Sequence, residues 1–436
     1  MRAPYLDVPP GVTDEERAAE LSDRLEEFLL DVGTFFPRAD LRHRAQGCLR
    51  GLLAPLSRKN GWQLAEYAGD AGPWNQQHLL ARAVWDEDAL RDFTRRYAVA
   101  GLDDGGRGPG PGGSGVLVVD ETGVGKKGRA SAGVARQFCG ALGGVFPCQV
   151  AVVAAWATSA GQALVDRALY LPREWTQDRE RCRAAGVPDE VGFATKPRLA
   201  EHMIDRILPD LPAGRVWAAA DEVYGRDGAF RAFLEERRIP YAVVVPARQT
   251  VLPRPGWRHV GRLVERCAAE EDWLELPDDE PDVGPAALWQ WWVRRIPDPD
   301  DEAGAGSWAR WVIARRRPAD PAERDYFLAW GPEQTEVEDL VRVPSARWSV
   351  EEAIKLAKSA CGMADYEVRS WRGWHRHVTL AQLAAAFLAV QSAEAARDGQ
   401  APGPGPATLS APPAQRGGPR SPHQHRGHRP DPGEHL

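Results

Sequence analysis

The first hundred residues alternate apolar and polar positions with the period of an α-helix. The segment 13–32 begins with a Thr-x-x-Glu capping box, formed by Thr13 and Glu16, and Leu25 and Leu29 then follow at helical spacing. The same periodicity predicts further helices at 39–53, 61–67, 75–83 and 87–99. We therefore expect a helical N-terminal domain over residues 12–100, with a DNA-binding role as one interpretation of its clustered arginines.

A Gly/Pro-rich linker, residues 101–114, separates this domain from a different pattern. Short apolar runs now alternate with amphipathic segments. The runs predict strands at 116–119, 149–156, 215–220 and 241–245, and the amphipathic segments predict helices at 196–208 and 229–237. Strands alternating with helices indicate a mixed α/β domain, in which helices pack on a sheet.

A Trp-rich segment with acidic and Pro-rich stretches interrupts the alternation at about 250–335. Within and after it we expect strands at 310–316 and 326–330 and helices at 346–361 and 379–395. The α/β domain with its insertion would then cover 115–398. The remaining residues, 399–436, are rich in Pro, Gly, Arg and His without apolar periodicity, which predicts a disordered tail.

Composition is that of a globular protein, with 43% apolar residues, 27% charged residues and a net charge of −7. A role on DNA would therefore have to use local basic patches. The six cysteines form no C-x-x-C pair, which favours a reducing compartment over a zinc ribbon or a disulfide framework. The sequence shows neither an apolar leader nor a stretch expected to span a membrane, so we expect a soluble, cytoplasmic protein without a membrane partner.

Two aspartates follow short buried runs of the α/β region. Asp120 follows VLVV and Asp221 follows VWAAA. Functional groups in α/β sheets gather at the carboxyl ends of strands, and carboxylates placed there bind hard divalent cations. Either aspartate alone is weak evidence, because Asp also caps the turn or helix after a strand.

A third carboxylate comes from the predicted helix 346–361. Arg347, Glu351 and Lys358 have the spacing R-x3-E-x6-K. At about 100° per residue they form one polar stripe, whereas Glu352 lies roughly 140° from Arg347. The spacing therefore selects Glu351. The alternative is an exposed helix with a favourable Arg–Glu pair four residues apart.

Several long runs resemble the insertion-sequence transposases of the seven-hundred-and-one group, from about residue 30 to residue 392. The resemblance implies an RNase H-like, retroviral-integrase-like α/β core in which Asp120, Asp221 and Glu351 form a DDE triad that binds two Mg²⁺ or Mn²⁺ ions. The R-x3-E-x6-K spacing is similar to the Y-R-E-K signature of hairpin-forming transposases, although Pro344 stands where that signature has Tyr. The runs that carry the resemblance are RGLLAPLSRKNGWQLAEYAGD, VVDETGVGKKG, RALYLPREWTQDRERCRAAGVPDEVGFATKP, ADEVYG and DYEVRSWRGWHRHVTLAQLAAAFLAV.

The resemblance also implies a function and partners. The function is cut-and-paste transposition: cleavage at the terminal inverted repeats of an element, then strand transfer into target DNA, by a homodimer in a synaptic complex associated with the nucleoid. Candidate phosphate contacts are Arg347, Lys358, Lys126, Lys127, Arg369 and Arg372. For each basic run, a solvated surface is an equally good interpretation. Most tryptophans of the insertion should pack in a core, while one of them would be able to stack on a flipped base.

Two other functions stay open. The first alternative is a catalytically decayed or domesticated transposase that only binds DNA, and the divergent insertion and tail favour it. The second alternative is an RNase H-like nuclease that cleaves DNA without joining it to a target. Cleavage and strand-transfer assays separate the three.

Overall fold

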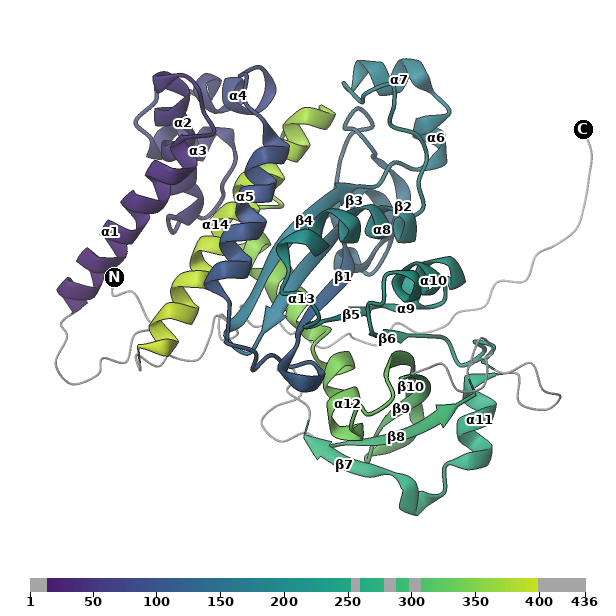
Figure 1. Ribbon diagram of the computed structural model, residues 1–436. Helices are drawn as coiled ribbons and strands as arrows, with labels where there is room; N and C mark the ends of the chain where they lie inside the picture. The colour runs from purple at the N-terminus through teal and green to yellow at the C-terminus, as the bar shows by residue number, and fades with distance from the viewer. Residues whose placement is uncertain (1–13, 252–258, 278–287, 298–306, 399–436) are drawn as a thin grey trace, which may run out of the picture.

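The computed structural model describes residues 14–251, 259–277, 288–297 and 307–398. Thr13 of the expected capping box, Trp257 of the insertion and the tail from residue 399 lie outside these residues. The described part contains one mixed sheet flanked by helices (Figure 1). The expected α/β class, a mixed sheet with packed helices, is confirmed at this level.

The sheet has ten strands in the order β2-β3-β1-β5-β6-β10-β9-β8-β7, with β4 also paired to β3. The pairs β1–β5 and β5–β6 are parallel, and all other pairs are antiparallel. The strands are β1 (Gly115–Gly125), β2 (Ala135–Cys139), β3 (Gly144–Thr158), β4 (Gly161–Leu169), β5 (Val216–Ala220), β6 (Tyr241–Val244), β7 (Leu274–Pro277), β8 (Leu288–Ile296), β9 (Trp308–Arg317) and β10 (Asp320–Pro332).

Helices cover both faces of the sheet because alternate side chains of the central strands are apolar on each face. Leu117 and Val119 of β1 pack with α8, α9 and α10, whereas Val116 and Val118 pack on the side of α13 and α14. The helices are α1 (Asp14–Gly33), α2 (Ala39–Leu53), α3 (Gly61–Tyr67), α4 (Trp74–Ala81), α5 (Glu87–Gly101), α6 (Arg173–Thr176), α7 (Arg179–Ala184), α8 (Lys196–Ile207), α9 (Glu222–Gly225), α10 (Gly228–Glu236), α11 (Val260–Cys267), α12 (Val337–Ser345), α13 (Trp348–Lys355) and α14 (Trp371–Arg397).

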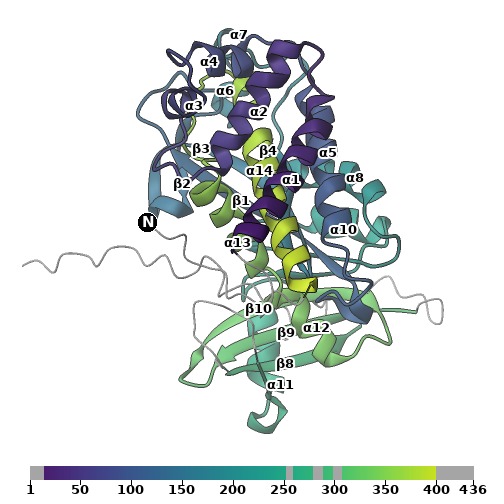
Figure 2. The same cartoon turned by 90° about the vertical axis from the view of Figure 1, so that its left-hand side faces the viewer.

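Helix α14 joins the N-terminal helices to the sheet. It lies between α1–α4 and β4 (Figures 1 and 2), and Phe387 on it contacts Phe28 of α1 with 4.8 Å between ring centroids. By length and composition alone, α14 is apolar enough to cross a membrane, which corrects the expectation that no stretch has that character. Two-thirds of its apolar window is buried inside the protein, as in the core helix of a globular fold.

Helix α14 also begins eight residues before the predicted start at Thr379. Ser370 caps it by accepting a hydrogen bond from the backbone N–H of Gly373, at 3.1 Å. The polar first turns are buried because their groups find partners: Arg376 donates to Glu87 at 3.1 Å and to the carbonyl of Trp85 at 2.9 Å. Because these first turns are polar, the pattern of apolar residues did not reveal the start of this helix.

The strands expected at 149–156, 215–220 and 241–245 are confirmed as β3, β5 and β6. The prediction of a strand ending at Asp120 is wrong in its end point: β1 continues to Gly125 because the long β3 pairs with it along its whole length. Strands β2, β4, β7 and β8 were not predicted. The strands expected in the insertion exist as β9 and β10, and they extend the central sheet because β10 pairs with β6.

A buried ionic cluster lies between α5, β4 and α8. Asp166 on β4 is fully buried, and four guanidinium groups surround its carboxylate. The nearest ion-pair distances run from 3.1 Å for Arg206 to 3.9 Å for Arg91 and Arg167, with Arg95 at 3.8 Å. The cluster satisfies a carboxylate that the interior would otherwise exclude.

Candidate active site

The parallel pairing of β1 with β5 brings the two predicted aspartates together. Val119 is in register with Ala220, so the next residues along the two strands, Asp120 and Asp221, are cross-strand neighbours. Adjacent strands lie about 4.8 Å apart. Val118 and Ala219, two residues before each aspartate, belong to one hydrophobic cluster, so both carboxylates project to the α13 side of the sheet.

Burial and mutual repulsion disfavour the charge on both carboxylates. The pKa of Asp120 is raised to about 7, first by desolvation and then by the charge of Asp221, while Arg347 lowers it. The pKa of Asp221 is also raised, first by desolvation and then by Glu121. The site therefore concentrates more negative charge than its own cations compensate.

Asp221 has a local role as well. It caps α9, with its Oδ1 accepting a hydrogen bond from the backbone N–H of Val223 at 2.9 Å. At the other end of α9, a Cβ on Gly225 would lie 1.9 Å from the carbonyl oxygen of Val244. Only glycine allows this short helix to rest directly on β6, and this packing holds Asp221 at the strand end.

Helix α13 presents Glu351 to the same site through Arg347. The guanidinium donates to Glu351 at 3.0 Å and lies 3.9 Å from the carboxylate of Asp120. Glu352 pairs instead with Lys355 at 3.7 Å. The predicted polar stripe of this helix selected Glu351 rather than Glu352, and the contacts in the structure distinguish the two glutamates in the same way. Glu351 remains 43% exposed, in contrast to Asp120 at 14%.

The candidate phosphate contacts differ in exposure. Lys358, in a π-helical turn after α13, donates to the carbonyl of Gly123 at 3.0 Å, and burial lowers its pKa. Lys126 lies 3.5 Å above the ring of Tyr366, and burial lowers its pKa to about 8. The ammonium groups of these two lysines therefore already have partners within the protein, close to β1.

The other candidates are exposed. Lys127, Arg369 and Arg372 are on the surface, and only Arg372 has an acidic neighbour, Glu87 at 3.9 Å, among the described residues. Arg347 alone of the six predicted cations touches the acidic site.

In the basic run 315–317 of the insertion, Arg316 is unsuited to contact a DNA phosphate. Its side chain is 3% exposed and lies 4.1 Å from the ring of Trp273. Trp289, Trp291 and Trp292 are also at least 95% buried. The described tryptophans of the insertion therefore pack in the core, with Trp308 half-buried, as expected for most of them.

Two residues near the site, Glu121 and Tyr224, were not singled out from the sequence. Glu121 points to the α8 side of the sheet and pairs with Lys196 at 2.5 Å. Tyr224 has a buried hydroxyl without a hydrogen-bond partner among the described residues, and burial together with Glu121 and Asp221 raises its pKa well above the usual value. Their closeness to the aspartates in DET and DEVY was the available signal.

The donor set suits a hard divalent cation in its chemistry. Asp120 and Asp221 offer adjacent carboxylate oxygens, and desolvation followed by the charge of neighbouring carboxylates raises their pKa values. A divalent cation would neutralise that charge. Across the described residues, no group of three His, Cys, Asp or Glu side chains converges as ligands, and Glu351 is hydrogen-bonded to Arg347. Two of the three predicted ligands, Asp120 and Asp221, are thus adjacent. The guanidinium group of Arg347 lies between Asp120 and the third predicted ligand, Glu351.

A match to a protein-family model defines the class of this protein. The model of the DDE superfamily endonucleases matches residues 31–283, more than half of the chain, and the chain belongs to this family of enzymes that act on DNA. The matched range includes Asp120 and Asp221 and ends before Glu351.

A curated relative points in the same direction. Over 207 residues the chain is 28% identical to a protein of Microchaete diplosiphon described as a probable transposase for insertion sequence element IS701. The match covers 47% of this chain and 49% of that protein, so the chain spans about half the length of the curated relative.

Proposed function

We propose that the chain is a DDE transposase, which cleaves DNA at the ends of an insertion sequence and transfers the strand to target DNA. The observation that carries the proposal is the register of β1 and β5, which makes Asp120 and Asp221 neighbours in a desolvated, acidic site. The family match and the transposase relative favour this reaction over other uses of paired carboxylates.

The strand order supports an RNase H-like core for this enzyme. In β4-β3-β1-β5-β6, three antiparallel strands continue into two parallel ones, with helices on both faces. Under this proposal the N-terminal helices of residues 12–100 contact DNA, residues 101–114 connect them to the catalytic domain of 115–398, and the segment 250–335 is an insertion within it.

Asp120, Asp221 and Glu351 would hold two Mg²⁺ or Mn²⁺ ions. When bound, such ions supply Lewis-acid stabilisation of the attacking and leaving oxygens in phosphoryl transfer. The protein's own contribution is positioning: β1 and β5 hold the aspartates, and α13 brings Glu351 and Arg347 above them. Arg347 is placed to exchange its carboxylate partners for a DNA phosphate, which its planar fork fits.

DNA is the partner that the remaining cations would recognise. Lys127 and Arg369 are exposed, and Lys126 and Lys358 lie along β1 behind the acids. The proposed substrates are terminal inverted repeats and target DNA, bound by a homodimer. The net charge of −7 makes the affinity depend on this local patch.

The direct test uses labelled duplexes that carry the ends of the element, with Mg²⁺ or Mn²⁺ and a supercoiled target. We expect cleavage and strand transfer by the wild type, and a loss of at least about 10³-fold in Asp120→Asn, Asp221→Asn and Glu351→Gln, since metal-stabilised phosphoryl transfer depends on several kcal/mol of charge stabilisation. Glu352→Gln is the matched control, because its carboxylate pairs with Lys355. Full activity of any of the three site variants contradicts the assignment.

A second candidate, a DNA-binding relative without catalysis, is favoured by one observation: Glu351 is bound to Arg347 and does not converge with the aspartates. That candidate predicts end binding by the wild type, with no cleavage under any divalent cation. A nuclease that cleaves without joining would give cut ends and no strand-transfer product.

A further inference from the structure

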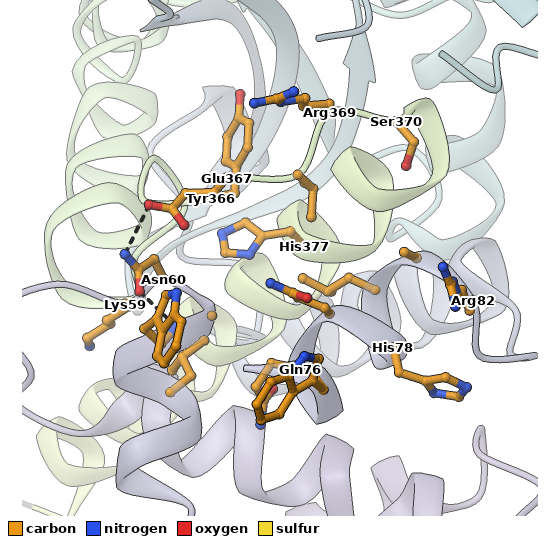
Figure 3. A pocket seen from close by; sticks show the side chains of 18 residues that line it. Lys59, Asn60, Gln76, His78, Arg82, Tyr366, Glu367, Arg369, Ser370 and His377 are labelled. Atoms are coloured by element: carbon orange, nitrogen blue, oxygen red, sulfur yellow. Dashed lines mark hydrogen bonds between the residues drawn. The ribbon is translucent and has the colours of Figure 1, made fainter. Parts of the chain in front are cut away.

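A cavity of about 580 Å³ lies between the N-terminal helices and the segment that leads into α14. Helices α3 and α4 form one side of it, and residues 366–370 form the other. In Figure 3, Tyr366 and Arg369 approach from one side and Gln76 and His78 from the opposite side. The cavity is separate from the aspartates of β1 and β5.

Two indoles that line the cavity are exposed. Trp62 on α3 is 58% exposed and Trp74 on α4 is 68% exposed. Neither ring stacks on another ring or cation in the described part of the chain. Trp74 lies directly over Gly72, where a Cβ would come within 2.3 Å of the ring. Exposed indoles in such positions leave costly apolar area in water unless a ligand covers it.

The side of the cavity beneath Trp62 is held rigidly. Asn60 caps α3 by accepting from the backbone N–H of Trp62 at 3.0 Å, and its amide donates to Glu367 at 3.1 Å (Figure 3). The backbone N–H of Lys59 donates to Asp365 at 2.9 Å. Two of these bonds join segments more than 300 residues apart, so the backbone that carries Trp62 is held in place before a ligand binds.

A polar group inside the cavity has no partner. The side chain of Gln76 is 2% exposed, and its Oε1 accepts no hydrogen bond from any described residue. Buried amides are almost always satisfied, so this one requires a ligand or a water molecule. An amide can pair with the donor and acceptor groups on the edge of a base.

The rim of the cavity is cationic. Arg82 and Arg369 are exposed lining residues, and neither side chain has an acidic partner among the described residues. The acidic lining residue, Glu367, is already engaged by Asn60 and lies 3.5 Å from Arg58. Exposed aromatic rings beside free guanidinium groups are what single-stranded nucleic acid requires: stacking for bases and charge for phosphates.

One contact links the cavity to the proposed catalytic strand. Tyr366 lines it, and Lys126, which covers the ring of Tyr366, follows β1 directly. At about 3.3 Å per strand residue, Lys126 lies roughly 20 Å from Asp120 along the chain. Under the proposal below, DNA bound at the acidic site extends past Lys126 to the cavity.

We propose that this cavity binds an unpaired nucleobase of the DNA substrate, stacked on Trp62 and Trp74, with Arg82 and Arg369 on its flanking phosphates. The proposal rests on the proposed function and names a substrate feature, unpaired DNA beside the cut. It also places stacking in the N-terminal helices, because the described tryptophans of the insertion are buried or half-buried.

The test measures DNA binding by the full chain in EDTA, without cleavage. The probes are a labelled duplex, the same duplex with one unpaired thymine, and single-stranded oligothymidylate, followed by anisotropy and indole fluorescence. We expect the wild type to prefer unpaired DNA. Trp62→Ala and Trp74→Ala should each weaken that binding roughly 5- to 100-fold, as expected for one lost stack, and leave duplex binding unchanged.

Two variants check that the rings themselves act. Gly72→Ala keeps Trp74 but displaces its ring, so it should also lose the preference. Trp62→Phe should restore much of it. Tyr67→Ala is the matched control, because Tyr67 is an aromatic residue of α3 with 50% exposure that does not line the cavity.

The inference is overturned if the wild type binds paired and unpaired DNA equally, or if the Trp variants lose both equally. Quenching by a small molecule or peptide but not by oligothymidylate would also overturn it. Because the binding measurement is made in EDTA and requires no cleavage, a failure of cleavage leaves it intact. The two proposals therefore fail separately.

Discussion

Two buried acidic regions of this protein have opposite charge balance. Around Asp166, four arginines approach one carboxylate within 3.9 Å. At the end of β5, Asp120 and Asp221 lie side by side with one nearby arginine, Arg347, which also binds Glu351. Both regions lie beside the same sheet, and in the second the pKa values of both aspartates are raised, first by desolvation.

The difference distinguishes a carboxylate that supports the fold from one available for chemistry. A buried charge surrounded by partners is costly to remove, because its partners lose their compensation. Carboxylates that repel one another are costly to keep, and such strain is typical of sites that bind cations or transfer protons. Burial alone would not have separated Asp166 from Asp120.

The largest expected effect is on the arginine cluster. Asp166→Ala should lower the free energy of unfolding by about 3–5 kcal/mol, because the buried guanidinium groups lose their central anion. Urea denaturation measures this change. Asp189→Ala is the control: its exposed carboxylate binds Arg179 and Arg183, and its removal should leave the unfolding midpoint almost unchanged. Equal losses in both would remove the structural role of Asp166.

The acidic site should respond in the opposite direction. In EDTA above pH 7, Asp120→Asn should raise the free energy of unfolding by on the order of a few kcal/mol, since each pKa unit corresponds to about 1.4 kcal/mol. The pKa of Asp120 is 3.8 when unperturbed and about 7 when folded. The folded protein therefore binds the extra proton, and wild-type stability should fall as pH rises from about 4 to about 7.

The pH dependence can be isolated by comparison with the variant. Over the same interval the curve for Asp120→Asn should be flatter than that of the wild type, with the slope of other groups cancelling in the difference. Parallel curves would mean that Asp120 ionises normally in the folded protein.

Divalent cations should reduce the repulsion. Mg²⁺ or Mn²⁺ at about one hundred times its dissociation constant should stabilise the wild type by about 2.7 kcal/mol, the value expected for binding to the folded state alone. Differential scanning fluorimetry of the wild type, Asp120→Asn and Asp221→Asn measures it. The shift should vanish in both variants and persist in Asp166→Asn, and a shift of equal size in all four proteins would place the cation elsewhere.

The smallest effect separates the two neighbouring lysines after β1. Lys127→Ala should weaken DNA binding modestly and lower the slope of log affinity against log salt by about 0.9, the contribution of one phosphate contact. Lys126→Ala should instead lower stability, because its ammonium lies on the ring of Tyr366. Fluorescence anisotropy at several salt concentrations tests the first, and thermal melting tests the second. Identical salt slopes for Lys127→Ala and the wild type would exclude the phosphate contact.

Helix positions could be predicted well where the pattern is local. Helices at 39–53 and 61–67 match α2 and α3 residue for residue, because apolar periodicity depends only on neighbours in the sequence. Strand β4 was missed because it carries a buried Asp166–Arg167 pair and a register shift opposite 154 and 155, and so lacks the alternation of an ordinary strand.

The candidate site was predictable only in part for the same reason. Helical spacing on one segment selected Glu351 over Glu352, and the structure pairs Glu351 with Arg347. The burial of Lys126 against Tyr366 joins residues 240 positions apart, and no local pattern encodes it. The Trp62–Trp74 cavity was equally invisible, since residues 366–370 complete it.

By itself, the sequence determined the class of this protein: a mixed α/β endonuclease of the DDE superfamily with two carboxylates that directly follow the apolar runs of its central strands. These features depend on residue type and short spacing, which a linear chain carries fully. Only the tertiary structure decided which charges are compensated and which are left to repel. That outcome depends on strand register and on side chains that meet from distant parts of the chain, because electrostatic energy depends on distance in space and on exclusion of water.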